Sequence, residues 1–249
     1  WAIARLRGGA PELLKVLPEL IRKAQACAGR MNEQEASNTM WAAAVLRKEA
    51  PVLRQLLPSL AKRLPGVVGD MPSQGISITV WATGVVEANS SLARKVLQTV
   101  MPRAEKILSR FTGQHIAQLC WGMALCDWRN ETLLKAVVAA FKDLAPAWRG
   151  KAAELDLPMI SYAFARLGAR SRVLLTIIAD KTTPTLRGRL NPWGLCALLW
   201  SYRELDTDNQ FASFRSRLEA EVARRSIPAN LVDQVILGPE EWGQLLKAS

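Results

Sequence analysis

The sequence Asn38-Thr39-Met40-Trp41-Ala42-Ala43-Ala44-Val45-Leu46 holds the pattern from which the architecture follows. Its central aromatic residue has equivalents along the chain at intervals of 38 to 41 residues, namely Trp1, Trp41, Trp81, Trp121, Tyr162 and Trp200. A constant period of this length is typical of repeat proteins, in which each unit buries its apolar face against the next. The sequence therefore predicts a repeat array over 1–225, followed by C-terminal capping helices over 226–249.

Each repeat is predicted to be a helical hairpin. Short polar residues that are good helix caps precede the aromatic rings, so a first helix begins near Asn32, Ser73 and Thr112 and ends near Leu46, Val86 and Cys126. A second helix begins about ten residues past the ring, where apolar residues recur at helical spacing. Pro18 and Pro58 share a register in it, and we expect the helix to start or bend there. The fold class is thus all-α, with about six hairpins.

Small residues surround the rings in most repeats. They occupy the first and third positions after the ring: Ala42 and Ala44, Ala82 and Gly84, Gly122 and Ala124, Ala163 and Ala165. Small side chains let neighbouring helices approach closely, so the ring is predicted to be a buried wedge between them. A ring that stacks on an unpaired base is the alternative. Burial predicts that Trp81→Ala costs about 3 to 5 kcal/mol of stability.

The charge balance favours an anionic partner. Lys and Arg number 33 and Asp and Glu 22, which gives a formal net charge of +11. Solubility of an apolar repeat array is the alternative reason for this excess. Cations recur at 14, 21 and 22 residues after the ring, and they predict a basic stripe that binds an RNA backbone: Lys15, Arg22, Lys23, Lys62, Arg63, Lys95, Arg103, Lys135 and Lys142. An ordinary solvated helix face remains the alternative, since offset 18 holds Glu19.

Glutamines also share a register. Gln34, Gln74 and Gln114 each lie seven residues before a ring. An identical residue in every repeat cannot distinguish different bases, so structural hydrogen bonds inside the array are the favoured interpretation. Positions that vary between repeats are better candidates for base contacts, and these are Asn38, His115 and Gln118.

The sequence offers no pattern for catalysis or for a metal. The four cysteines form no C-x-x-C pair, and His115 is the only histidine and lies in zinc-ligand spacing with none of them. Neither a G-x-S-x-G motif nor a phosphate-binding glycine loop is present. We therefore expect no enzyme activity, no metal and no cofactor. Because no run of about 18 apolar residues occurs, we also expect no membrane insertion.

The second repeat, with Gln34 and the run Ala36-Ser37-Asn38-Thr39-Met40-Trp41-Ala42-Ala43-Ala44-Val45-Leu46, resembles the octotricopeptide-type repeat, also called the heptatricopeptide-like repeat of RAP-domain proteins. The resemblance extends from Trp1 to about Arg225 and is weakest in the last two repeats, where Tyr162 replaces tryptophan and Trp193 occupies the glutamine position. Residues 226–249 do not resemble a RAP domain. The family implies a right-handed α-solenoid that acts on RNA in the mitochondrial matrix or the chloroplast stroma.

On this resemblance, the expected partner is ribosomal RNA or an organellar transcript, together with other proteins of a ribonucleoprotein complex. The expected function is that of a non-catalytic RNA-binding protein of organellar gene expression, either as a ribosome-associated subunit or as a factor for transcript maturation or stability. The alternative is a protein-interaction scaffold or accessory subunit in an organellar complex, which would use the same fold.

Overall fold

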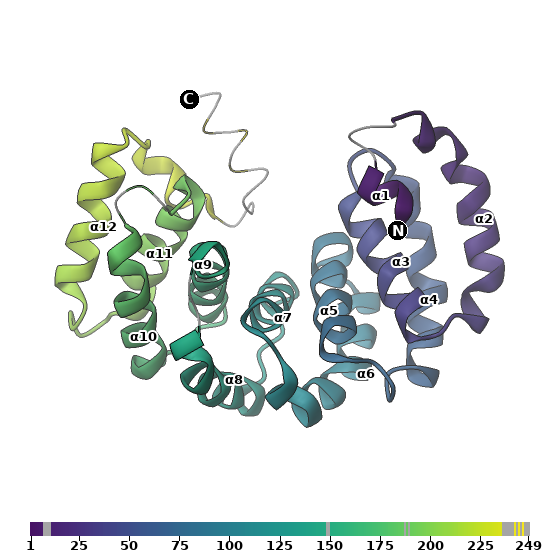
Figure 1. Cartoon of the computed structure of the whole chain (residues 1–249), viewed down its shortest axis with the longest axis horizontal. Coiled ribbons are helices and arrows are strands. Elements are labelled where there is room, and N and C mark those ends of the chain that lie inside the picture. Colours follow the sequence, from purple (N-terminus) through teal and green to yellow (C-terminus); the bar gives the residue numbers. More distant parts are fainter. Residues whose placement is uncertain are drawn as a thin grey trace. The chain divides into compact units, whose positions relative to one another are not determined.

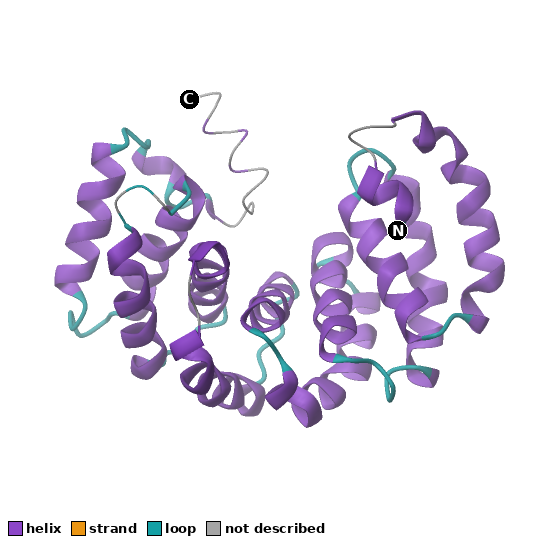
Figure 2. Ribbon diagram, in the orientation of Figure 1, coloured by secondary structure: helices purple, strands orange, loops and turns teal. Residues whose placement is uncertain are grey.

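The computed structural model of the chain describes residues 1–6, 11–147, 150–186, 188, 190–235, 242, 244 and 246. Every regular element in these ranges is helical, which confirms the predicted all-α class (Figures 1 and 2). The first helices are α1 (Ala2–Leu6), which follows Trp1, and the ring-bearing α3 (Glu33–Val45), α5 (Ser73–Glu87), α7 (Gly113–Leu125), α9 (Gly150–Arg166) and α11 (Pro192–Leu205). The second helices are α2 (Leu17–Cys27), α4 (Leu57–Arg63), α6 (Ser91–Ile107), α8 (Glu131–Leu144), α10 (Arg172–Thr182) and α12 (Ala212–Arg224).

The chain divides into two compact units. The first comprises residues 1–111 and 122–128, and the second comprises residues 112–121 and 129–249, so α7 contributes to both. In the first unit α3 packs against α5, and α6 packs against both α5 and α4. In the second unit α9 packs against α11, α11 against α12, and α8 against α10. Each unit therefore has a layer of first helices and a layer of second helices, as a helical repeat requires.

Proline lies at the start of two of the second helices, α2 and α4. The 3₁₀ helix η1 (Pro11–Val16) precedes α2, and η3 (Pro51–Leu56) precedes α4. Pro18 and Pro58 then lie in the first turn of α2 and α4. A first turn suits proline because its missing N–H would have no intrahelical acceptor there. The prediction that these prolines start the second α-helix is confirmed.

The first helices begin at different kinds of cap. Asn32 forms a capping box with Glu35, as its position predicts. The predicted start near Ser73 is confirmed, because α5 begins at Ser73, but the predicted capping role is wrong, because the N-cap is Pro72 and no side chain caps the helix. At α7 the Thr112 hydroxyl accepts a hydrogen bond from the His115 N–H at 3.4 Å, so Thr112 acts as predicted.

The ring residues differ in burial. Trp121 and Tyr162 are 4% and 1% exposed, as the wedge prediction requires. Three others, at positions 41, 81 and 200, are half-buried. The prediction is wrong for Trp1, which is 60% exposed and lies under the guanidinium of Arg5. The burial of the ring therefore varies from repeat to repeat.

The second unit contains a ladder of these rings. The ring centroids of Trp121 and Tyr162 are 4.8 Å apart, and those of Tyr162 and Trp200 are 5.2 Å apart. Trp193 meets Trp121 edge-on, with the centroids 5.4 Å apart. Aromatic pairs at such distances stabilise a core beyond the area that they bury. Successive repeats of this unit are therefore joined through their ring positions.

The segment after α12 covers the start of α11. It contains the 3₁₀ helix η8 (Ala229–Leu231), and the indole N–H of Trp193 donates to the Val235 carbonyl at 3.1 Å. Trp242 is buried and donates to the Leu231 carbonyl at 2.7 Å. Trp193, which stands where earlier repeats have glutamine, is thus buried by the predicted capping region. Residues 236–241, 243, 245 and 247–249 of the predicted capping region lie outside the described residues.

Candidate nucleic-acid interface

The first helices α3, α5 and α7 present an uncharged face. In α3 this face carries Gln34, Asn38, Trp41 and Val45, spaced by four, three and four residues. Such spacing places side chains in one row along a helix. Gln34 is exposed and the other three are half-buried. The row therefore offers two amides and part of an indole to solvent.

The neighbouring helix α5 repeats the row. Gln74 is exposed and Trp81 is half-buried, at the same positions as Gln34 and Trp41. α3 and α5 pack side by side within the first unit, so the two rows occupy equivalent positions on adjacent helices. We call this surface the amide–indole face and define it by Gln34, Asn38, Trp41, Gln74 and Trp81. Gln114, exposed, and Gln118, half-buried, share the register on α7.

The prediction that the glutamines make internal hydrogen bonds is wrong, because all three are exposed. Helix geometry gives the reason. The core side of α3 is formed by Ala36, Met40 and Ala43, which repeat the four-three spacing from a different starting residue. At about 100° per residue, Gln34 lies roughly 200° around the helix axis from Ala36. The glutamine register is therefore a surface register.

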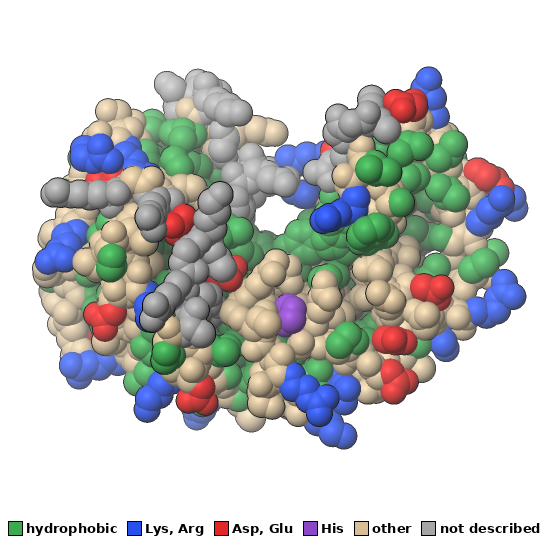
Figure 3. All heavy atoms as spheres, viewed as in Figure 1, with side chains coloured by type: hydrophobic (Ala, Val, Ile, Leu, Met, Phe, Trp, Pro, Cys, Tyr) green, Lys and Arg blue, Asp and Glu red, His purple; other side chains and the backbone are tan. Residues whose placement is uncertain are grey.

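The predicted basic stripe is exposed at seven of its nine positions: Lys15, Arg22, Lys23, Lys62, Lys95, Lys135 and Lys142. Of these, Arg22 and Lys23 lie 2.8 and 3.6 Å from the Glu19 carboxylate, so the acid at offset 18 offsets part of their charge. Lys135 and Lys142 belong to the second unit and the rest to the first. Lys and Arg side chains are visible on the surface of both units (Figure 3).

Arg63 and Arg103 have a structural role. Their Nε–H groups donate to the carbonyls of Met31 and Met71, at 2.7 and 3.3 Å. Met31 and Met71 each lie ten residues before a ring, so the two arginines tie equivalent second helices to the start of their first helices. Both arginines are half-buried. These hydrogen bonds within the repeat explain why the two arginines share a register, and a role in RNA binding is not needed to explain it.

Arg225 makes the corresponding contact in the last repeat, at the start of α11. Its Nη2 donates to the Leu186 carbonyl at 2.8 Å, and its Nη1 donates to the carbonyl of Leu190, ten residues before Trp200. Arg225 lies three residues further from its ring than Arg63 does, whereas the acceptor carbonyl lies ten residues before the ring in both repeats. The hydrogen bond from a second-helix arginine to the carbonyl ten residues before the ring therefore recurs in three repeats.

The predicted base-contacting residues lie in two settings. Asn38 and Gln118 are half-buried, three residues before the rings of their helices. His115 caps α7, because its Nδ1 accepts a hydrogen bond from the Thr112 N–H at 3.2 Å. Partial burial lowers the pKa of His115 below its ordinary value of 6.5. Its imidazole is therefore neutral in the folded protein, and its Nδ1 is already hydrogen-bonded to the Thr112 N–H.

We expect the stability of the second unit to depend on pH through His115. The pKa of His115 is lower in the folded protein than its ordinary value of 6.5. The stability that neutral His115 contributes is therefore fully present above pH 6.5, and it is lost as the pH falls toward the lowered pKa. Protonation of Nδ1 also removes the acceptor for Thr112. Urea unfolding measured between about pH 7.5 and 5.5 should show this loss. In His115→Gln, whose amide can cap without titrating, the loss should be smaller, and equal pH dependence in both proteins would contradict the assignment.

Sequence reasoning missed two cations on ring-bearing helices. Arg5 and Arg166 each lie four residues after a ring and are exposed, so they stand in the ring row. Burial raises the pKa of Tyr162 to about 12, and the charge of Arg166 acts against that shift. The same position holds valine at 45 and 85, leucine at 125 and glutamate at 204, so no constant residue type marks it.

Three of the four cysteines are buried, and Cys27 is exposed. Burial raises the pKa of Cys120, Cys126 and Cys196 to about 12, which keeps them protonated near neutral pH. In the described ranges, no three His, Cys, Asp or Glu side chains are grouped as a metal site needs. Nor does any described helix combine the length and apolar character needed to cross a membrane.

No protein-family model matches the chain, and no curated protein is significantly similar to it.

Proposed function

We propose that this chain is a non-catalytic RNA-binding protein, built as a right-handed α-solenoid, that acts in organellar gene expression. The amide–indole face carries the proposal. It offers one exposed glutamine and one half-buried tryptophan from each of two adjacent helices, in the same register. Single-stranded RNA is recognised through hydrogen bonds to base edges and through stacking on aromatic rings. Both kinds of group are present in each repeat of this face.

The spacing of the helices supports the same partner. Packed α-helices lie about 8 to 10 Å apart, and repeat proteins that read RNA use two or three side chains of one repeat for one base. Gln34 and Trp41 form one such set and Gln74 and Trp81 the next. Because the sets are alike, we propose contacts that accept several bases, and Asn38 is the residue that differs between them.

Cations supply the attraction for phosphate. Lys62, Lys95 and Lys135 are exposed on second helices and form no ion pair with the described carboxylates. They lie on the second-helix layer, whereas the amide–indole face lies on the first-helix layer. We therefore propose that the lysines raise the local concentration of RNA, and that Arg5 and Arg166 are the cations nearest to the ring rows.

The organelle and the process rest on the resemblance of the repeat to the octotricopeptide type. On that basis we propose the mitochondrial matrix or the chloroplast stroma as the location. The RNA would then be ribosomal RNA, bound as a ribosome-associated subunit, or an organellar transcript during maturation or stabilisation. Crosslinking followed by sequencing of the bound RNA from isolated organelles distinguishes these two RNAs.

Two sets of substitutions test RNA binding. Fluorescence anisotropy with a random-sequence single-stranded RNA, measured over a range of salt concentrations, gives the affinity and its salt dependence. Changing Lys62, Lys95 and Lys135 to glutamate should reduce the salt slope by about 0.7 for each phosphate that the protein no longer neutralises. Changing Gln34, Gln74 and Gln114 to alanine should weaken binding with the slope unchanged.

The control is Gln98→Ala, which removes an exposed glutamine from the second helix α6 and should leave the affinity unchanged. Circular dichroism checks that every variant folds. If the wild-type chain binds no RNA at low salt, or if neither set of substitutions changes its affinity, the proposal is wrong. In that case the alternative of a protein-interaction scaffold gains support, and the second unit carries a surface suited to that role.

A further inference from the structure

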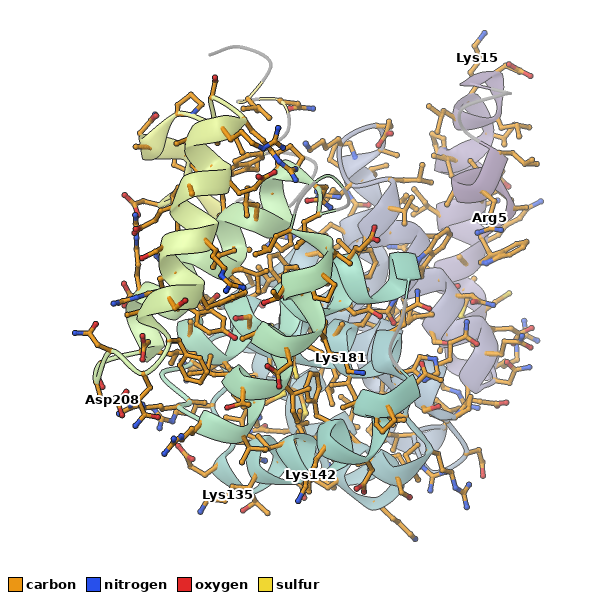
Figure 4. All side chains as sticks on the ribbon, turned by 60° about the vertical axis from the view of Figure 1, so that its left-hand side comes forward. Arg5, Lys15, Lys135, Lys142, Lys181 and Asp208 are labelled. Carbon is orange, nitrogen blue, oxygen red and sulfur yellow. The ribbon has the colours of Figure 1, made fainter. Side chains whose placement is uncertain are left out.

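An open groove lies between α8 and α10 in the second unit. Its volume is about 650 Å³, and its lining combines cations with aliphatic side chains: Lys142, Ala145, Pro146, Arg172, Val173, Thr176, Ile177 and Lys181. Lys142 stands in the last turn of α8 and Lys181 in the last turn of α10. Figure 4 shows these two lysines on the neighbouring helices. None of the described lining residues is acidic.

The floor of the groove is an apolar row on α10. Val173 and Ile177 are four residues apart, so they lie one turn above another on the same side of the helix, and Lys181 continues the row. Val173 is 47% exposed, so its side chain is open to solvent in this row. Pro146 and Ala145 face this row from the end of α8 and the following turn.

The three cations at the groove have no carboxylate partner in the described part of the chain. Lys142, Arg172 and Lys181 form no ion pair there, whereas Arg170 and Arg203 in the same unit are paired with Asp208 and Glu219. Arg172 also stands in the first turn of α10, which contains no acidic residue. Its charge therefore adds to the positive end of the helix dipole instead of offsetting it.

We propose that this groove binds an acidic, amphipathic segment of a partner protein. One or two aliphatic side chains of that segment lie on Val173 and Ile177, and its carboxylates pair with Lys142, Arg172 and Lys181. The apolar floor explains why a peptide fits better than RNA. Unpaired bases bind by stacking on aromatic rings, and none of the described lining side chains is aromatic.

Charge complementarity and apolar contact act together in this site. Exposed ion pairs alone contribute little, so an acidic segment without apolar residues should bind weakly. An apolar segment without carboxylates would leave three cations unpaired at its edge. The site thus selects segments that carry both features. It does not depend on the amide–indole face, because Lys142 and the other lining residues belong to the second unit and to its second-helix layer.

The experiment uses the whole chain and a short fluorescein-labelled peptide in which leucines alternate with pairs of aspartate or glutamate. The double variant Lys142→Glu/Lys181→Glu should weaken binding of this peptide by about tenfold or more, since it reverses two charges at the site. Val173→Ser should weaken it several-fold. Lys135→Glu is the matched control, an exposed lysine of α8 that does not line the groove, and it should leave peptide affinity unchanged.

Two further probes separate the contributions. A peptide in which serine replaces every leucine should bind much more weakly, and a poly(U) RNA should lose far less affinity than the leucine peptide does in the double groove variant. Circular dichroism confirms folding. The proposal is overturned if the leucine peptide has a Kd above about 1 mM, or if the double variant binds this peptide as tightly as the wild type does. It is also overturned if the double variant loses poly(U) binding while the serine and leucine peptides bind equally, because the groove would then be an RNA site.

Discussion

Trp121→Ala is expected to lower the free energy of unfolding by about 3 to 5 kcal/mol, the range for deleting a large aromatic side chain from a core. The indole is 4% exposed and contacts two other aromatic rings, those of Tyr162 and Trp193. Its removal leaves a cavity between repeats and breaks the ring ladder at its first member. Chemical denaturation followed by tryptophan fluorescence and by circular dichroism measures the loss.

The control for this prediction is Trp1→Ala. Trp1 occupies the same position in its repeat but is 60% exposed, so its loss should change stability by less than about 0.5 kcal/mol. Trp81→Ala should fall between the two because Trp81 is half-buried. Equal losses for Trp1 and Trp121 would show that repeat position, and not burial in this fold, sets the contribution of the ring.

The rings also show what sequence can and cannot predict. Their period and the small residues after them predict an all-helical chain of hairpins, because a fixed repeat of apolar positions has few other solutions. The period cannot predict that Trp121 is buried and Trp1 is not. Burial depends on what packs on each side of a ring, and neighbours in space are not encoded at the ring's own position.

The glutamines and arginines illustrate a second limit. A shared register shows that a residue has a recurring role, but it does not reveal the role. The register favours an interior position for Gln34, which is exposed, and an RNA contact for Arg63, which donates its Nε–H to the Met31 carbonyl. A rotation of about 100° per residue separates core from surface on a helix, so the orientation of the helix must be known before a register can be interpreted.

The groove between α8 and α10 cannot be found from the repeat at all. Lys142 shares its register with Lys62, but Arg172 and Lys181 belong to the following repeat and share no constant position with other cations. Only the packing of α8 against α10 brings the three together. Sites formed between repeats depend on residues that the repeat pattern treats as variable.

Gly122→Ala is expected to destabilise the protein, although alanine normally favours a helix over glycine by about 0.5 to 1 kcal/mol. A Cβ at Gly122 would lie 2.5 Å from the Val80 carbonyl oxygen and 2.8 Å from the Trp81 nitrogen, both backbone atoms that cannot turn away. Forced separation of packed helices costs about 1 to 3 kcal/mol. This cost exceeds the gain in helix propensity, so the net effect should be a loss, and Gly122→Val should lose more.

Gly75→Ala is the matched control, because Gly75 also lies inside a first helix but a Cβ there would meet its neighbours at 3.4 Å or more. With no clash, the helix propensity of alanine should dominate, and we expect Gly75→Ala to be neutral or to stabilise the protein by up to about 1 kcal/mol. Urea unfolding of the two variants therefore gives shifts of opposite sign. If Gly122→Ala also stabilises the chain, α5 and the end of α7 do not approach as closely as their backbones indicate, and the small residues after the rings have no role in bringing the helices together.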